Sequence, residues 1–265
     1  MTLEGRSLYT PWHVGAADAL VDANARDWDY DSRFRRVEFP DLHPAVIEAD
    51  ALVDRCGVEH HRFFTIAGRS RDALALWVEQ EVFVTGVFAQ LLSLTASTIV
   101  NVHLRAMFNV VVHGEHGPTT RDEAKFAHPT LLHNLRESMG IVEDDMRLAP
   151  PTQRFLEAIA RSMTSTLSAL GSLGVGNERM LVPEYSAVEK AFDQAWPDAG
   201  HRAFLRANIE EDTEHSAIIS RIASTMISMQ PETASQYSSG AKSGVDARMR
   251  YYDELTSLYE SRTAH

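Results

Sequence analysis

The spacing of apolar residues constrains the fold of this chain more than any other feature. From Arg71 onward, apolar side chains recur at intervals of three and four, as in Leu74, Trp77, Val78 and Val82. This spacing lines one side of an α-helix, whereas the period of two that is typical of strands is nearly absent. We therefore predict an all-α protein.

Proline, glycine and capping residues set the boundaries of the predicted helices. The helices are predicted, in chain order, at 44–56, 71–96, 98–112, 129–139, 152–173, 183–192, 201–229 and 245–261. Gly140 is expected to end the fourth in a left-handed conformation. Pro183 is expected to open the sixth, because the first turn of a helix does not need its missing N–H.

These segments predict a single helical domain over residues 1–265. An irregular N-terminal arm covers 1–58, and a helical core covers 59–230. Residues 231–244 are rich in Ser, Gly and Ala and are interpreted as a linker, which a C-terminal helix follows at 245–262.

Charge and cysteine content exclude several classes of protein. The 265 residues include 25 basic and 37 acidic side chains, a net charge of −12, which argues against a nucleic-acid partner. The single cysteine, Cys56, excludes an intrachain disulfide and cysteine-based zinc or iron–sulfur sites. The N-terminus lacks a signal-peptide pattern, and the longest apolar region, 74–102, is interrupted by Glu79, Glu81 and Gln90. We expect a soluble, cytoplasmic protein with no membrane partner.

The helix predicted at 201–229 carries the most informative group of polar residues. Asn208, Asp212 and His215 are spaced by four and three, so their side chains project from one face of that helix. Carboxylate and imidazole groups together suit iron or manganese, and helical bundles place such sites between facing helices. An acidic, solvated face with one chance histidine explains the same spacing equally well.

Other stretches of the chain supply further candidate ligands. Glu81 lies among apolar residues, where an unpaired carboxylate is costly to bury, and Glu115 ends a very apolar segment. His128 precedes Pro129 at the start of a predicted helix. Glu178 stands before the helix expected at Pro183, where the helix dipole alone would favour it.

The order of these motifs resembles the haem-oxygenase-like iron-containing oxidases and oxygenases over about residues 60–230. The matching motifs are a glutamate on a long early helix, an E-x-G turn, an H-P-x-L-L segment, E-R-M-L-V-P, and F-L-R-A-N-I-E-E-D-T-E-H-S. The resemblance implies a seven-helix bundle without haem and a dinuclear iron site that activates dioxygen. It implies that the core at 59–230 binds the metal.

The metal ligands that the resemblance implies come from both halves of the core. They are Glu81, Glu115 and His128 from the first half, Asp212 and His215 from the late helix, and Glu178 as an additional carboxylate. His116 and His113 are alternatives to His128. Asn208 stands where the family pattern has histidine, and its neutral amide is a weaker ligand. One iron is then loosely held, absent, or completed by another group such as His201 or Glu211.

The resemblance implies an oxidoreductase of specialised metabolism. It would use two Fe(II) ions, with manganese as an alternative, and dioxygen to oxidise a small amino-acid-like or amine substrate. N-oxygenation, desaturation and carbon–carbon cleavage all remain open, and so does a homodimer. Competing hypotheses are a mononuclear iron variant, a cofactor-free oxidase, and a non-catalytic helical protein of the same fold. A thiamine-fragment hydrolase would need a nucleophilic cysteine within the matched region, which Cys56 is not.

Overall fold

The computed structural model describes residues 29–116 and 127–264. By its internal contacts the chain divides into two units, Met1–Arg36 and Val37–His265. In the first unit the described part holds a short helix, α2 (Tyr30–Phe34). The carboxylate of Asp29 caps this helix by accepting hydrogen bonds from the backbone N–H groups of Asp31 and Ser32.

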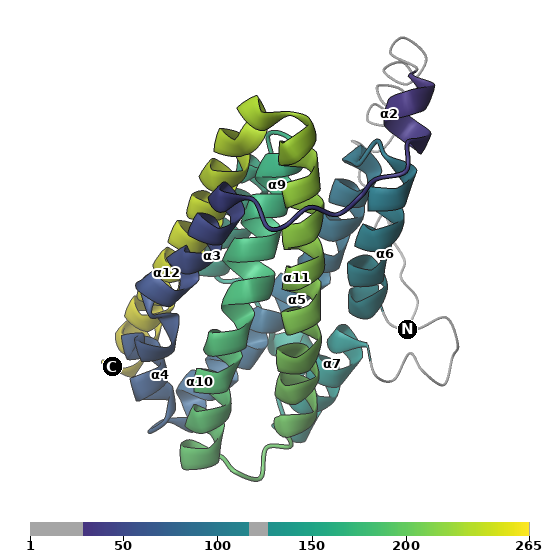
Figure 1. The fold of residues 1–265 in the computed structure, drawn as a ribbon. Helices are drawn as coiled ribbons and strands as arrows, with labels where there is room; N and C mark the ends of the chain where they lie inside the picture. Colours follow the sequence, from purple (N-terminus) through teal and green to yellow (C-terminus); the bar gives the residue numbers. More distant parts are fainter. Residues whose placement is uncertain (1–28, 117–126, 265) are drawn as a thin grey trace. The chain divides into compact units, whose positions relative to one another are not determined.

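The second unit is built from helices (Figure 1), and its described residues contain no strand, which confirms the all-α prediction. The α-helices are α3 (Pro44–Cys56), α4 (Arg62–Ala67), α5 (Arg71–Thr98), α6 (Val102–His116), α7 (His128–Ser138), α8 (Pro150–Ser162), α9 (Thr166–Leu173), α10 (Met180–Ala195), α11 (Arg202–Met229) and α12 (Ala234–Thr263). Short 3₁₀ segments lie at Val58–His60, Glu143–Asp145 and Pro231–Thr233, and a π-helical segment at Gly174–Arg179 joins α9 to α10.

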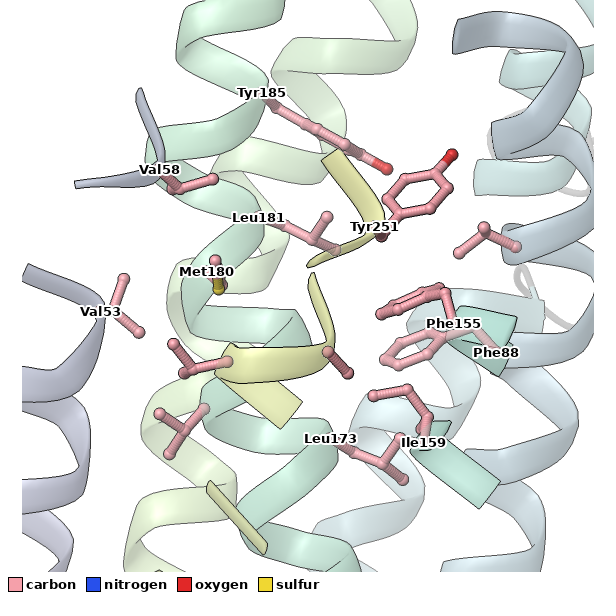
Figure 2. Close-up of a cluster of buried hydrophobic side chains, with 14 of the residues drawn as sticks. Val53, Val58, Phe88, Phe155, Ile159, Leu173, Met180, Leu181, Tyr185 and Tyr251 are labelled. Atoms are coloured by element: carbon pink, nitrogen blue, oxygen red, sulfur yellow. The ribbon is translucent and has the colours of Figure 1, made fainter. Parts of the chain in front are cut away.

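The core of the second unit lies where the long helices face one another. Helix α5 packs against α6, α7 and α8, helix α12 packs against α3, α8 and α9, and α10 packs against α11. Figure 2 shows side chains from these helices meeting in the core, among them Phe88 of α5, Phe155 of α8 and Tyr251 of α12. The rings of Phe155 and Tyr251 lie 5.1 Å apart between centroids.

Several predicted boundaries are confirmed. Helix α3 covers 44–56 as expected, and α5 begins at Arg71, where the hydroxyl of Ser70 accepts a hydrogen bond from the N–H of Ala73. Gly140 follows α7 with a φ of 71°, the left-handed conformation that was predicted for it. Local capping chemistry therefore sets these ends of the helices.

The linker predicted at 231–244 is wrong, because these residues form a 3₁₀ turn and the first part of α12. Their small side chains reflect close packing of helices. A Cβ atom on Gly240 would lie 2.0 Å from the carbonyl oxygen of Ser168, and one on Gly244 would lie 2.7 Å from that of Ser172. Small residues here let α12 approach α9 closely, which composition alone cannot distinguish from a flexible segment.

The helix predicted at 152–173 is in fact two helices. Helix α8 ends at Ser162, and α9 begins at Thr166 with the hydroxyl of Ser165 accepting a hydrogen bond from the N–H of Ser168. Serine and threonine side chains at 162–166 offer the backbone alternative hydrogen bonds, and this favours a break.

The break expected between the helices predicted at 152–173 and 183–192 is also wrong. The chain continues from α9 through the π-helical segment into α10, and Pro183 lies inside α10. A proline ring clashes with the carbonyl of the residue four positions earlier, which here is Arg179. The wider π-helical turn ends at that residue, which is consistent with the helix continuing past the proline.

Within the described residues, α5 passes a length and composition test for a membrane-spanning helix. It buries Trp77, Gln80 and Glu81 against other helices, and core helices of soluble proteins pass the same test.

Candidate metal centre

Four buried side chains from three stretches of the chain converge inside the second unit. They are Glu115 in the last turn of α6, Glu178 in the π-helical segment, and Asp212 and His215 on α11. Each offers one ligand atom, and these atoms all lie within 4.8 Å of one another. The structure thus brings together residues that the sequence separates by up to 100 positions.

The imidazole of His215 lies among the carboxylates. Its Nδ1 atom is 3.3 Å from Glu178 Oε2, and it is 3.8 Å from both Glu115 Oε1 and Asp212 Oδ1. This arrangement surrounds one imidazole nitrogen with three carboxylates, which is the mixed donor set that iron and manganese accept.

Local structure explains how each side chain reaches the cluster. Asp212 and His215 are three residues apart on α11 and therefore share a face, as the spacing predicted. Gly114 allows His215 to lie directly against α6, because a Cβ atom at Gly114 would be 2.6 Å from the Cε1 and Nε2 atoms of His215. The sequence motif had drawn attention to Gly117, which lies outside the described residues.

Negative charge is concentrated in the cluster. Burial and the neighbouring carboxylates raise the pKa of Glu178 and of Asp212 well above their ordinary values. Both oxygens of each carboxylate and Nδ1 of His215 are buried and have no hydrogen-bond partner among the described residues. Buried polar atoms are normally satisfied, so these orphaned atoms fit a bound cation.

His128 joins the same network from the start of α7. Its Nδ1 lies 3.0 Å from Glu115 Oε1, and its Nε2 lies 3.2 Å from Glu211 Oε2. Burial lowers the pKa of His128, but the interactions with Glu115 and Glu211 outweigh it and raise the pKa to about 11. His128 thus lies between two carboxylates, and Glu211 approaches the cluster through it.

The histidines considered as alternatives to His128 are not found beside Glu115 in the described residues. His113 is exposed on α6, and the side chain of His116 lies outside the described part of the chain. His201 does not approach the cluster through its ring, which stacks on Phe192 at 4.7 Å and pairs with Asp193 at 3.3 Å. Of the three histidines considered for this position, the structure places His128 beside Glu115.

Glu81 and Asn208 lie outside the group of four. Together with Glu115 they line a pocket of about 10 Å³. The Oε1 atom of Glu81 accepts a hydrogen bond of 2.8 Å from the hydroxyl of Tyr185. The amide nitrogen of Asn208 donates to the carbonyl of Phe204 at 2.7 Å, so only its oxygen is left to act as a ligand.

Sequence reasoning missed a buried ionic network beside this pocket. Arg248 of α12 is 1% exposed, and its Nε lies 2.9 Å from Oε2 of Glu184, which is fully buried on α10. Glu184 also accepts a hydrogen bond from the hydroxyl of Tyr252, which in turn accepts one from the indole N–H of Trp77.

A sequence signal for Arg248 existed. It stands three residues after Val245 and four before Tyr252, on a stripe that is otherwise apolar. By contrast, two arginines on α6 and α11 are engaged away from the cluster. Arg206 is exposed and pairs with Glu189 at 2.8 Å, and Arg105 donates to the carbonyl of Ile99.

Comparisons with known proteins agree with this fold and donor set. The model of a family described as iron-containing redox enzymes matches residues 75–249, more than half of the chain. None of the curated proteins matches.

Solved structures show the same fold at low identity. A CADD-like protein of unknown function from Nostoc punctiforme superposes with a TM-score of 0.66 at 16% identity, over 83% of this chain and 96% of that one. A TenA homolog from Pseudomonas syringae pv. tomato gives a TM-score of 0.65 at 13% identity, over 83% of this chain and 94% of that one.

Proposed function

Because the chain belongs to the family of iron-containing redox enzymes, we propose that it is a non-haem iron-dependent oxidoreductase. It uses dioxygen to oxidise a small amino-acid-like or amine metabolite. It acts in the cytoplasm on a small-molecule substrate, without nucleic acid or membrane partners and with a homodimer as an open alternative. The reaction is N-oxygenation, desaturation or carbon–carbon cleavage.

One observation carries the proposal: three carboxylates and an imidazole bring their buried ligand atoms together, and those of Glu178, Asp212 and His215 have no hydrogen-bond partner among the described residues. The ligand atoms of Glu115, Glu178, Asp212 and His215 lie within 4.8 Å of one another, and all four residues are buried. Desolvated carboxylates at this separation repel one another unless protons or a cation neutralise them. A purely structural protein gains nothing from such an arrangement.

The residues of the chain have defined tasks in this proposal. Glu115, Glu178, Asp212 and His215 would hold the iron, which when bound supplies the redox chemistry that dioxygen reduction requires. His128 pairs with Glu115 and links it to Glu211. The close packing of Gly114 on His215 fixes the imidazole.

Anaerobic Fe(II) titration tests the proposal, with Glu178→Gln and Glu214→Gln as a matched pair. Glu178 is fully buried in the cluster, whereas Glu214 is exposed on α11. We expect Glu178→Gln to weaken iron binding at least tenfold and Glu214→Gln to leave it unchanged. Oxygen uptake by the iron-loaded protein is then screened against amino acids and amines.

The competing hypotheses predict other results. A cofactor-free oxidase consumes oxygen without iron, and a non-catalytic helical protein does neither and tolerates Glu178→Gln. Equal iron affinity for the two variants, or no binding at all, would refute the proposal. Cys56 does not favour the hydrolase alternative, because its half-buried thiol donates to the carbonyl of Val53, and burial raises its pKa.

A further inference from the structure

A small pocket beside the cluster is the position for a second metal ion that the resemblance to di-iron enzymes implies. Three of the implied ligands line it: Glu81 of α5, Glu115 of α6 and Asn208 of α11. Arg248 of α12 lines the same pocket. The volume of about 10 Å³ leaves room for about one water molecule.

The guanidinium of Arg248 is a permanent cation in this part of the molecule. Burial on its own lowers the pKa of Arg248, but the carboxylates of Glu184 and Glu81 raise it above the ordinary value, so the group stays charged. The Nε atom lies 2.9 Å from Glu184 Oε2, and the guanidinium carbon lies 4.9 Å from the centre of the Phe155 ring. Salt bridge and aromatic ring together hold it in place.

Glu81 is the carboxylate that a second metal ion would use, and it already has neighbours. Its Oε1 atom accepts a hydrogen bond from Tyr185, whereas its Oε2 atom is buried without a partner among the described residues. Burial raises the pKa of Glu81, and the charge of Arg248 opposes this rise. A divalent ion on Glu81 would stand close to the guanidinium in a desolvated site, where like charges repel strongly. Asn208 brings no charge to offset this repulsion.

We propose that the guanidinium of Arg248 takes the place of a second metal ion in this pocket. The chain then binds one metal ion, at Glu115, Glu178, Asp212 and His215. In this arrangement Glu81 is bonded to Tyr185, shares the pocket with Arg248 and does not ligate the metal. The inference rests on the proposed function and specifies the number of ions. It also leaves the pocket between Arg248 and Glu115 free for one molecule the size of water.

Anaerobic titration with Mn(II) alone, followed by electron paramagnetic resonance, tests this inference without any assay of activity. We expect one equivalent per chain with the spectrum of an isolated ion. Glu81→Gln and Glu178→Gln form a matched pair, since both remove the charge of a buried glutamate. The first should change the Mn(II) affinity by less than threefold, and the second should weaken it at least tenfold.

A gain-of-site variant provides the complementary test. Arg248→Met combined with Glu184→Gln removes the cation together with its partner, which avoids leaving an uncompensated buried carboxylate at Glu184. With Asn208→His added, we expect a second equivalent of Mn(II) and a spin-coupled spectrum.

Two outcomes overturn the inference. Two equivalents bound by the unmodified protein would show that Arg248 does not take the place of a second ion. A tenfold loss of affinity in Glu81→Gln would show that Glu81 ligates a metal. The proposed function stands in both cases. Absence of any Mn(II) or Fe(II) binding would remove the proposed function and the inference together.

Discussion

Replacing Gly114 with alanine should damage the metal centre without touching a ligand. Gly114 lies on α6 directly against the ring of His215, and a Cβ atom there would be 2.6 Å from two ring atoms and 3.3 Å from Glu211 Oε2. Ordinary van der Waals contact begins near 3.4 Å, so the imidazole must retreat by about 0.8 Å, or the two helices must separate.

The size of the effect follows from this displacement. Metal–ligand distances tolerate deviations of only about 0.2 Å, so a shift of about 0.8 Å removes His215 as an effective ligand. Disturbing a residue that orients a ligand typically costs about 10- to 100-fold in metal affinity, and we expect a loss in that range. In the metal-free protein, overpacking costs about 1–3 kcal/mol, against which the helical preference of alanine restores about 0.5–1 kcal/mol.

Gly86→Ala is the matched control, because Gly86 lies within helix α5 and nothing is within 4 Å of its Cβ position. This variant should gain about 0.5–1 kcal/mol of stability and keep the metal affinity unchanged. Chemical denaturation gives the free energies of unfolding, and anaerobic Co(II) titration, monitored by visible absorbance, gives the affinity and the ligand environment. Equal Co(II) affinity and equal spectra for the two variants would mean that His215 does not bind the metal in the position described.

Three further outcomes are expected. Tyr185→Phe removes the hydrogen-bond donor to the buried Glu81 carboxylate and should lower the free energy of unfolding by about 1–3 kcal/mol. Tyr259→Phe removes a half-buried hydrogen bond to Ser70 and should lower it by about 1 kcal/mol or less. Equal losses for the two variants in chemical denaturation would contradict this prediction. Burial raises the pKa of the Glu184 carboxyl group from 4.5 to about 7. The stability that this group contributes is therefore complete below pH 4.5 and is lost as the pH rises to 7, by at most about 3 kcal/mol. Glu184→Gln should flatten the pH dependence of the free energy of unfolding in that window, and an unchanged slope would refute this prediction. Fe(II) at 100 times its dissociation constant should raise the free energy of unfolding by about 2.7 kcal/mol, and a chelator should reverse this in the unmodified protein but have no effect on Asp212→Asn.

Local patterns in the sequence predicted most helices of the fold but not all of the junctions between them. The period of apolar residues identified α5 and α11, and a glycine with positive φ ended α7 as expected. The break predicted between α9 and α10 and the linker predicted at the start of α12 were wrong, because glycine and proline at these positions lie within packed helices. Propensity describes a residue alone, whereas packing depends on the helix opposite it.

The candidate site was predictable as far as spacing along one helix determines geometry. Asp212 and His215 had to share a face of α11, and the structure places Glu115 and Glu178 beside them. The spacing of residues along a helix does not show whether a buried carboxylate faces a metal ion or other side chains. The neighbours of Glu81 could therefore not be inferred from the sequence. A charged residue on an apolar stripe, as at Arg248, is the signal that finds such partners.

The π-helical segment at Gly174–Arg179 also determines the rotational phase of everything that follows it on the same helix. Because an α-helix turns about 100° per residue, deleting one residue from this segment would swing the whole of α10 by more than a quarter of a revolution relative to α9. Glu184 and Tyr185 would then leave the interior along with Glu178. A change in the length of this segment would therefore disrupt the candidate metal centre and the network around Arg248 together.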